Sequence, residues 1–323
     1  VLSNSFLAAL SAQMQQRGLC ALFPKCSSAA LVTRSRVVVR MDAIDPDVTP
    51  FAEGMHYNAR LQAPNVWEIA VDPSIVDEAA AIFAEPAFHS VTAEGEPYEE
   101  VHSSAGPFFV HRVLSWSSDA AWVAVDSAAG FDRFRSLFER MRLPERLAPL
   151  VPGAELRMYC AFYVVRSQCS AANYHYDYKR SVGTDALTLI TPLHNYRERH
   201  SFQLSYISQR LEDLKAAAAE ASSEELLPRA AGEVRRYEYR KGRAIVFGSS
   251  FMHSTEVGAG CGGEPHAYMC FTFGTTQEER WPSILETIGS QSRLLVKPSG
   301  ELGFSELGAA LEALIDGRLG AHR

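Results

Sequence analysis

The sequence predicts an α+β protein with a mostly β core, a barrel of short strands flanked by helices. Three observations lead to this prediction. Short β-branched and aromatic runs, separated by Gly, Ser, Asn and Pro, fill residues 155–276, and short strands in series are typical of a barrel or sandwich. Helix-forming segments precede and follow this region. With 47% apolar residues among 323, the chain can bury a substantial core.

Residues 1–40 differ in composition from the rest of the chain. They carry five basic side chains and no acidic one, and they are rich in Ser and Ala. Such a composition is typical of a transit peptide, so we expect this segment to direct the chain to a plastid or a mitochondrion. A disordered or helical N-terminal arm is the alternative. Residues 41–323 are expected to form a single domain.

The region before the core is expected to mix strands and helices. Strand-like runs occupy residues 66–71, 107–116 and 120–125, and a helix is expected over 74–85. A second helix, over 131–142, is expected to end at Leu143 and Pro144, because proline cannot donate to the helical hydrogen-bond ladder.

The core strands and the C-terminal helices follow. We expect the strands at residues 155–167, 186–193, 201–208, 235–240, 243–249 and 267–275. The segment 209–233, rich in Ala and Glu, is expected to be a solvated helical insertion; a lid over the barrel mouth is the alternative. The C-terminal part, about 281–320, is expected to form helices over 283–295 and 305–319.

Composition also excludes several classes of protein. The net charge of −7 argues against a broad nucleic-acid-binding surface, which is normally basic. No apolar run approaches the roughly 18 residues that a membrane span needs. None of the six cysteines belongs to a CxxC pair, so we expect neither a disulfide framework nor a zinc finger. Cys160 and Cys270 lie in apolar runs and are expected to be buried.

One short stretch, NYHYDYKRSVG (173–183), carries candidate chemistry. It places His175 and Asp177 two positions apart, between tyrosines. Residues i and i+2 share a face of an extended segment, so the imidazole and the carboxylate are expected to converge while the tyrosines pack on the other side. Such a pair can hold a metal, or it can be an ordinary buried hydrogen bond.

A third ligand is available from a later strand. The run 243–249 is followed by His253 and then by a Gly-rich turn. Two histidines and one carboxylate can occupy one face of an octahedral iron(II) ion and leave three positions open. We therefore interpret His175, Asp177 and His253 as a metal site.

These residues carry a resemblance to a known superfamily. Residues 155–276 resemble the double-stranded β-helix core of the iron(II)/2-oxoglutarate-dependent oxygenases, a jelly-roll barrel like that of the cupins. That superfamily is marked by His-x-Asp near an early core strand and a distal His near a late one, which His175, Asp177 and His253 match. The resemblance covers roughly 120 of the 323 residues and implies that these three residues bind Fe(II).

The sequence departs from the superfamily at one place. Most members carry an Arg or Lys soon after the distal His, where it binds the far carboxylate of 2-oxoglutarate. Here no Lys or Arg lies between His253 and Arg280, and His266 occupies the expected position. Further candidates for binding the cosubstrate lie near the strand at 186–193 and on the strand before the motif: Arg180, His194, Tyr163 and Thr188.

The resemblance implies an enzyme that couples oxidative decarboxylation of 2-oxoglutarate to hydroxylation, desaturation or cyclisation of a small molecule, with ascorbate as a reductant. Asp177 favours these reactions over halogenation, because halogenating members replace this carboxylate with a small residue. The alternative is a cupin-type barrel whose metal has a non-oxidative role or a role independent of 2-oxoglutarate. The lack of a basic residue after His253 supports that alternative.

Overall fold

The computed structural model describes residues 47–92, 94–112, 118–151, 155–196, 202–220, 232–260 and 265–320. The chain divides into a unit spanning residues 1–38 and a compact unit spanning 39–323, and all elements named below belong to the second. The expected transit peptide, residues 1–40, lies outside the described residues. Cys20, Cys26 and Cys261 also lie outside them.

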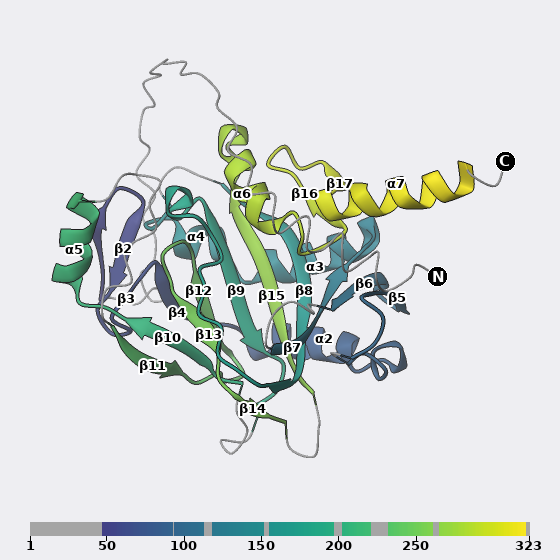
Figure 1. The fold of residues 1–323 in the computed structure, drawn as a ribbon, viewed down its shortest axis with the longest axis horizontal. Helices are drawn as coiled ribbons and strands as arrows, with labels where there is room; N and C mark the ends of the chain where they lie inside the picture. Colours follow the sequence, from purple (N-terminus) through teal and green to yellow (C-terminus); the bar gives the residue numbers. More distant parts are fainter. Residues whose placement is uncertain are drawn as a thin grey trace. The chain divides into compact units, whose positions relative to one another are not determined.

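A long, largely antiparallel sheet crosses the whole unit (Figure 1). Its strands, from one edge to the other, are β4 (Val66–Ala70), β12 (Arg243–Phe247), β9 (Ala186–Pro192), β15 (His266–Thr275), β8 (Leu156–Cys169), β7 (Ser118–Val125), β6 (Gly106–Arg112) and β5 (Tyr98–Ser103). The short β14 (Gly258–Ala259) also pairs with β8.

A smaller sheet faces part of the long one. It contains β11 (Glu233–Tyr237), β10 (Leu204–Ser208) and β13 (His253–Thr255), and an isolated bridge adds His175 beside His253. From β8 onward the chain alternates between the two sheets: β8, the segment at His175, β9, β10 with β11, β12, β13 and then β15. This winding is a double-stranded β-helix, so the predicted fold is confirmed.

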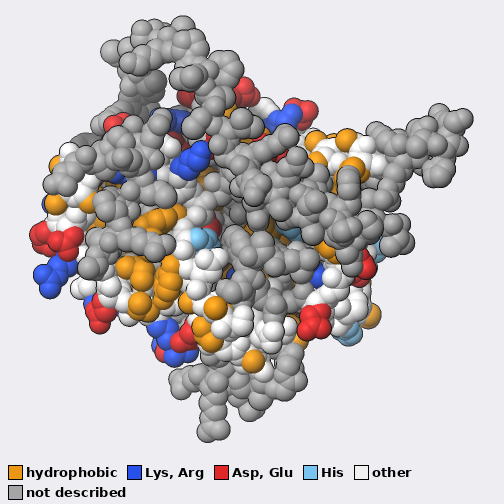
Figure 2. All heavy atoms as spheres, viewed as in Figure 1, with side chains coloured by type: hydrophobic (Ala, Val, Ile, Leu, Met, Phe, Trp, Pro, Cys, Tyr) orange, Lys and Arg blue, Asp and Glu red, His pale blue; other side chains and the backbone are white. Residues whose placement is uncertain are grey.

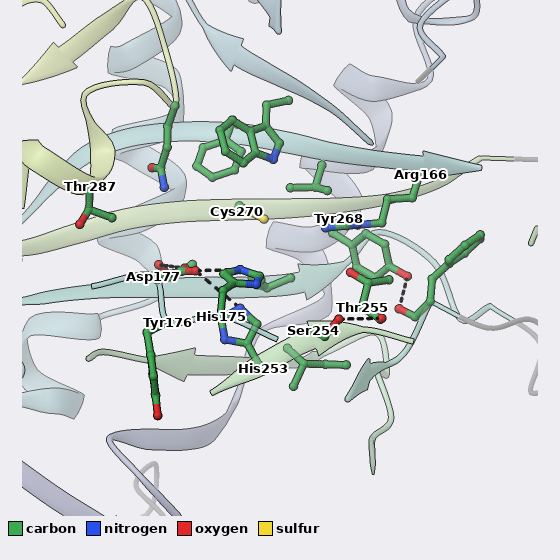
Figure 3. A pocket seen from close by; sticks show the side chains of 18 of the residues that line it. Arg166, His175, Tyr176, Asp177, His253, Ser254, Thr255, Tyr268, Cys270 and Thr287 are labelled. Carbon is green, nitrogen blue, oxygen red and sulfur yellow. Dashed lines mark hydrogen bonds and ion pairs between the residues drawn. The ribbon is translucent and has the colours of Figure 1, made fainter. Parts of the chain in front are cut away.

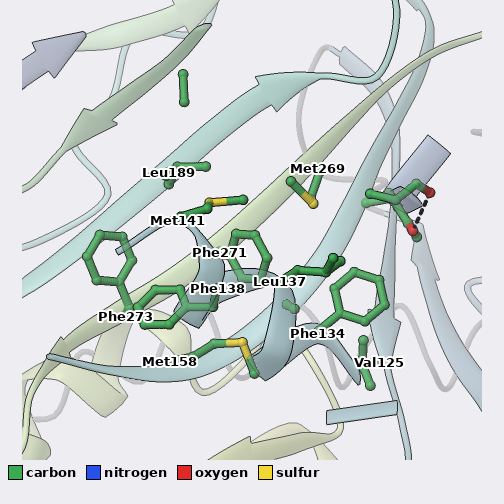
Figure 4. Close-up of a cluster of buried hydrophobic side chains, with 14 of the residues drawn as sticks. Val125, Phe134, Leu137, Phe138, Met141, Met158, Leu189, Met269, Phe271 and Phe273 are labelled. Atoms are coloured by element: carbon green, nitrogen blue, oxygen red, sulfur yellow. Dashed lines mark hydrogen bonds between the residues drawn. The ribbon is translucent and has the colours of Figure 1, made fainter. Parts of the chain in front are cut away.

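The outer face of the long sheet packs on helices. Helix α2 (Pro73–Phe83) buries one side against it, and α3 (Ala128–Arg140) presents apolar residues at helical spacing. Figure 4 shows side chains of α3 against those of β15 and β9. The residues that it labels from these three elements are Phe134, Leu137, Phe138, Leu189, Met269, Phe271 and Phe273. Because this face carries the main core, the inner face of the sheet is left to form a site.

The remaining elements lie around this core. They are β1 (Val48–Ala52), β2 (Met55–Asn58), β3 (Ala63–Pro64), α4 (Leu143–Leu147), α5 (Leu211–Glu220), α6 (Trp281–Ile288), β16 (Leu294–Val296), β17 (Leu302–Phe304) and α7 (Glu306–Gly320), with 3-10 helices η2 (Pro86–Phe88), η3 (Arg180–Val182) and η5 (Glu278–Arg280). Strands β1, β2 and β3 form a separate small sheet.

Three expectations about these elements need correction. The helix expected over 283–295 ends at Ile288, and Leu294 begins a hairpin strand instead. Helix α3 ends at Arg140 because Arg142 adopts a left-handed backbone (φ 54°), and Pro144 then lies in the first turn of α4, where proline is favourable. The strands at 48–64 and 98–103 were not expected at all.

Charged side chains of both signs lie on the described surface. On the face shown in Figure 2, basic and acidic side chains of the described residues are interspersed. Within the described ranges, no helix has the length and the apolar character that a membrane crossing requires. The described cysteines, Cys160, Cys169 and Cys270, are all buried free thiols.

Candidate metal centre

The three predicted ligands meet where the segment after β8 runs beside β13. The Oδ1 atom of Asp177 lies 3.5 Å from Nε2 of His175 and 3.6 Å from Nε2 of His253 (Figure 3). Donor atoms of the three side chains all lie within 4.8 Å of one another. These N···O distances exceed the roughly 2.7–3.2 Å of a well-formed N–H···O hydrogen bond. The arrangement suits a cation bound between the three side chains better than a direct hydrogen bond.

Backbone geometry, rather than a regular strand, holds the two histidines together. His175 and His253 exchange a pair of backbone hydrogen bonds, each of 3.0 Å, and their ring centroids lie 4.6 Å apart. The 3.5 Å between Nε2 of His175 and Oδ1 of Asp177 confirms the predicted convergence of these two side chains. The segment is extended only at the bridge to His253.

Each histidine is fixed in the tautomer that metal binding requires. Nδ1 of His175 lies 2.8 Å from the carbonyl oxygen of Asn173, and Nδ1 of His253 lies 3.0 Å from that of Phe251. A carbonyl can only accept, so each Nδ1 carries the proton and donates it. In the neutral form of each ring, Nε2 then keeps the lone pair, and this atom lies toward the shared site.

The carboxylate is held from the neighbouring strand β9. The hydroxyl of Thr188 donates to Oδ2 of Asp177 at 3.1 Å, and the Tyr178 hydroxyl lies 3.1 Å from that of Thr188. Oδ1 is thereby left for the metal. Tyr178 supports the ligands through Thr188 and does not pack away from them, contrary to the expectation for the tyrosines of this stretch.

Burial and charge set the protonation states of the ligands. Burial lowers the pKa of His253 to about 4, and the nearby Asp177 offsets part of that effect. Burial also acts to lower the pKa of His175, but its contact with Asp177 outweighs this and raises it. For Asp177, burial raises the pKa, but the two histidines outweigh it, so the net pKa is lowered. An ionised Asp177 and a neutral His253 are the forms that bind metal.

The ligands lie in a cavity of about 380 Å³ between the two sheets. Its walls come from β7, β8, β9, β10, β13 and β15, and from α6 with the turn after it. The lining combines apolar and aromatic side chains with polar and charged ones, and such a combination suits a small-molecule site.

The lining contains one basic side chain that the sequence analysis overlooked, Arg166 near the end of β8. Its Nη1 atom is buried and has no hydrogen-bond partner among the described residues. Its charge acts to lower the pKa of both His175 and His253. A signal was present in the sequence, because Arg166 ends a long apolar strand where a charge needs a partner.

The other predicted cosubstrate residues lie elsewhere, and none of them except Thr188 lines the described cavity. His266 stacks on Tyr196, with ring centroids 3.8 Å apart and planes within 8°. Arg180 lies on η3, and His194 follows β9. Thr188 lines the cavity, but its hydroxyl is committed to Asp177.

Tyr163 faces the outer core, opposite to the cavity. Its hydroxyl donates to the carbonyl of Ala79 on α2 at 2.8 Å, whereas Phe162, Val164 and Arg166 line the cavity. Tyr163 could bind the cosubstrate only if its face of the strand pointed into the barrel, and the structure places it in the outer core instead. Both faces of β8 are buried, so its apolar residues do not alternate with polar ones and the inward face cannot be read from the pattern.

No protein-family model and no curated protein matches the sequence. Solved structures with a similar fold include SnoN, a non-heme alpha ketoglutarate dependent epimerase from nogalamycin biosynthesis, at 15% identity (TM-score 0.42; 68% of this chain, 81% of that one). HygX from Streptomyces hygroscopicus, with nickel and 2-oxoglutarate bound, is 11% identical (TM-score 0.42; 66% and 83%). A Pseudomonas putida prolyl-4-hydroxylase is 13% identical (TM-score 0.38; 65% and 92%).

Proposed function

We propose that this protein is an iron(II)/2-oxoglutarate-dependent oxygenase that acts on a small molecule. One observation carries the proposal: the ligand set of His175, Asp177 and His253 shares a cavity with Arg166, a cation that has no acidic partner among the described residues. A keto acid that chelates the metal and carries a second carboxylate requires two things: a metal site with open positions and a group that binds the second carboxylate.

The donor set fits iron(II). Two imidazole nitrogens and one carboxylate oxygen, all drawn from one side of the cavity, form the facial arrangement typical of non-haem iron oxygenases. Bound iron would supply the activation of oxygen that couples keto-acid decarboxylation to substrate oxidation. Asp177 remains as a ligand, which favours hydroxylation, desaturation or cyclisation as the outcome.

Arg166 replaces His266 as our candidate for binding the far carboxylate of the keto acid. A guanidinium stays charged across the working pH range and offers paired donors to a carboxylate. Its neighbours are aromatic, since Tyr239 and Tyr268 also line the cavity and the Arg166 charge acts on the pKa of both. Arg166 pairs in register with His266 on β15, so the basic group comes from the strand beside the expected one.

This assignment removes the main support for a cupin-type barrel with a non-oxidative metal. That alternative depended on the missing basic residue after His253. Arg166 supplies a cation to the cavity from another strand, so the composition of the site again favours the oxygenase.

The test is turnover of 2-oxoglutarate by the purified protein. With iron(II), ascorbate and oxygen, we expect succinate to form from 2-oxoglutarate even without a second substrate, at the slow rate of uncoupled reaction. His175→Ala, Asp177→Ala and His253→Ala should each abolish it. Full succinate formation by any one of these variants would remove that residue from the ligand set.

Variants of Arg166 test the cosubstrate. Charged hydrogen bonds contribute about 1.5–3 kcal/mol, so Arg166→Leu should raise the KM for 2-oxoglutarate at least tenfold. Arg166→Lys should raise it less, because it keeps the charge and loses the paired geometry. Arg157→Leu, on the same strand but in a separate cavity, and His266→Ala should leave it unchanged. An unchanged KM in Arg166→Leu would refute the assignment.

A further inference from the structure

The cavity has a second end, which differs in chemistry from the end that holds Arg166. In the view of Figure 3, Arg166 and Thr287 lie on opposite sides of the metal ligands. The second end is formed by α6 and the turn after it, together with β7 and β8. If the keto acid reaches from the metal toward Arg166, the space beside α6 is left for the substrate.

One amide in this second end is held in a single orientation. Oε1 of Gln291 accepts hydrogen bonds from the hydroxyl of Thr272 at 3.0 Å and from the thiol of Cys160 at 3.8 Å. All three side chains are buried, and Gln291 is only 8% exposed. Since both donors contact the oxygen, the amide NH₂ group must lie on the other side of the carboxamide.

That NH₂ group has no acceptor within the described part of the chain, yet Gln291 lines the cavity. A buried amide normally satisfies its donors. The two fixed contacts on Oε1 therefore leave a preoriented donor that a ligand oxygen in the cavity would satisfy. Neither the metal ligands nor Arg166 take part in this group of contacts.

Charge distinguishes the two ends of the cavity. Among the described residues of its lining, Arg166 is the one cation, and the α6 side contributes Glu286 with the neutral Thr287 and Ser290. Glu286 forms an ion pair with Lys179, which does not itself line the cavity. The cation described at this end, Lys179, is already paired with Glu286, so no free positive charge among the described residues there would balance a second anion, and the Glu286 carboxylate would favour a cation over an anion.

The apolar wall of this end is aromatic. Trp122 on β7 and Phe162 on β8 both line it, and their ring centroids lie 6.1 Å apart. Val164 and Cys270 continue the apolar surface toward the metal ligands. Aromatic side chains favour contact with a flat or apolar body.

We propose that Gln291 donates a hydrogen bond that orients the substrate, and that this end accepts a neutral or cationic molecule with an apolar body and rejects an anion. This inference rests on the proposed function, since it assigns the Arg166 end to the keto acid. Gln291 acts as a specificity residue, and Thr272 and Cys160 act on it as positioning residues.

The test uses three probes that share a phenyl ring: phenylacetamide, which is neutral, phenethylamine, which is cationic, and phenylacetate, which is anionic. Binding is measured by calorimetry without oxygen on protein loaded with iron(II) and saturating 2-oxoglutarate, which keeps Arg166 occupied. We expect phenylacetamide and phenethylamine to bind at least tenfold more tightly than phenylacetate. Equal or tighter binding of phenylacetate, or no binding of any probe, would overturn the proposal.

Variants assign the contacts. Gln291→Leu should weaken the binding of phenylacetamide about three- to tenfold, the range for one neutral hydrogen bond, and should leave the affinity for phenethylamine within twofold. Glu286→Gln should weaken the binding of phenethylamine and leave the affinity for phenylacetamide within twofold. Gln168→Leu, on an exposed residue of β8, is the matched control. Should Gln291→Leu fail to fold, Gln291→Asn, which shortens the same amide, must show the same selective loss. An unchanged affinity for phenylacetamide would refute the role of Gln291.

The proposed function is tested separately on the same preparations. Succinate formation from 2-oxoglutarate without any probe depends on the metal ligands and Arg166, and it is measured on the wild type and on Gln168→Leu, whose residue lies outside the cavity lining. If succinate forms but the probes do not discriminate by charge, the inference about Gln291 fails and the oxygenase remains. If no succinate forms, the oxygenase itself is refuted.

Discussion

At the scale of single residues, the candidate metal ligands are held in place by neighbours outside the ligand set. Thr188 holds Oδ2 of Asp177, and two backbone carbonyls fix the histidine tautomers. Loss of such an outer contact typically reduces metal affinity tenfold to a hundredfold. The site is thus built from hydrogen bonds as much as from ligands.

Thr188→Val should therefore weaken iron(II) binding about tenfold or more while the protein stays folded. Thr191→Val is the matched control, because Thr191 is a buried threonine of the same strand whose hydroxyl donates to the carbonyl of Arg243. Metal titration followed by competition with a chelator measures the iron(II) affinity of both variants. Equal metal affinity in the two variants would show that the Thr188 contact does not support Asp177.

A second residue-scale prediction concerns His111 on β6. Burial lowers its pKa to about 4, below the roughly 6.5 expected in the unfolded chain. As the pH falls from 6.5 toward 4, the unfolded state takes up a proton first, so stability present above pH 6.5 is lost. The loss is at most about 3 kcal/mol, from 1.36 kcal/mol per pKa unit.

His111→Phe should flatten the acid side of the stability profile, measured as the free energy of unfolding in denaturant between pH 7 and pH 4.5. His102→Phe replaces an exposed histidine of β5, and this variant should show the same slope of unfolding free energy against pH as the wild type. A slope unchanged by His111→Phe would show that other groups account for the acid sensitivity.

At the scale of elements, Arg293 connects the end of β7 to α7. Its guanidinium contacts both carboxylate oxygens of Asp126, at 3.1 and 2.6 Å, and Oε1 of Glu312 on α7 at 3.3 Å. The Asp126 side chain is fully buried. Burial keeps the pKa of Asp126 raised in spite of Arg293, so the pair does not recover the whole cost of its desolvation.

Arg293→Met should destabilise the protein by about 3–5 kcal/mol, because it leaves a buried carboxylate unpaired. The double variant Arg293→Met with Asp126→Leu should recover most of that loss. Unfolding free energies of the two single variants and the double variant form a thermodynamic cycle that measures the pair. Equal destabilisation in the Arg293→Met single variant and the double variant would contradict this account.

At the scale of the whole molecule, the metal ligands join segments that lie far apart in the chain. His175 and Asp177 follow β8, and His253 opens β13. A metal that binds only the folded state stabilises it by about 2.7 kcal/mol at a hundred times its Kd. Iron(II) added without oxygen should raise Tm in the wild type and not in Asp177→Ala. A matching rise in the variant would place the metal elsewhere.

The N-terminal segment remains a prediction at this scale. If residues 1–40 form a transit peptide for a plastid or a mitochondrion, their deletion should leave a soluble protein with unchanged uncoupled succinate formation. Fusion of residues 1–40 to a fluorescent protein should direct it to one of these organelles. Loss of folding on deletion would instead make the segment part of the domain.

The sequence by itself determined the barrel and the three candidate metal ligands. Strands in series, the spacing of His175 and Asp177, and a histidine after the strand at 243–249 are local features, and residues two positions apart converge where the backbone is extended, as it is at the His175 bridge. The helices α2, α3 and α7 were likewise predicted, since each repeats apolar or helix-favouring residues over several turns.

Only the tertiary structure decided which other groups reach the cavity. The sheet is covered on both faces, so β8 shows no polar alternation that would separate Arg166 from Tyr163. The pairing of β8 with β15 also shifts register: Cys160 lies opposite Thr272, whereas Met158 lies opposite Phe273. The extra residue on β8 interrupts the alternation of side chains between the two faces of the strand. Gln291 and Thr272 are 19 residues apart and meet through packing of α6 on the sheet. Contacts of this kind depend on how elements pack, and local sequence does not encode that packing.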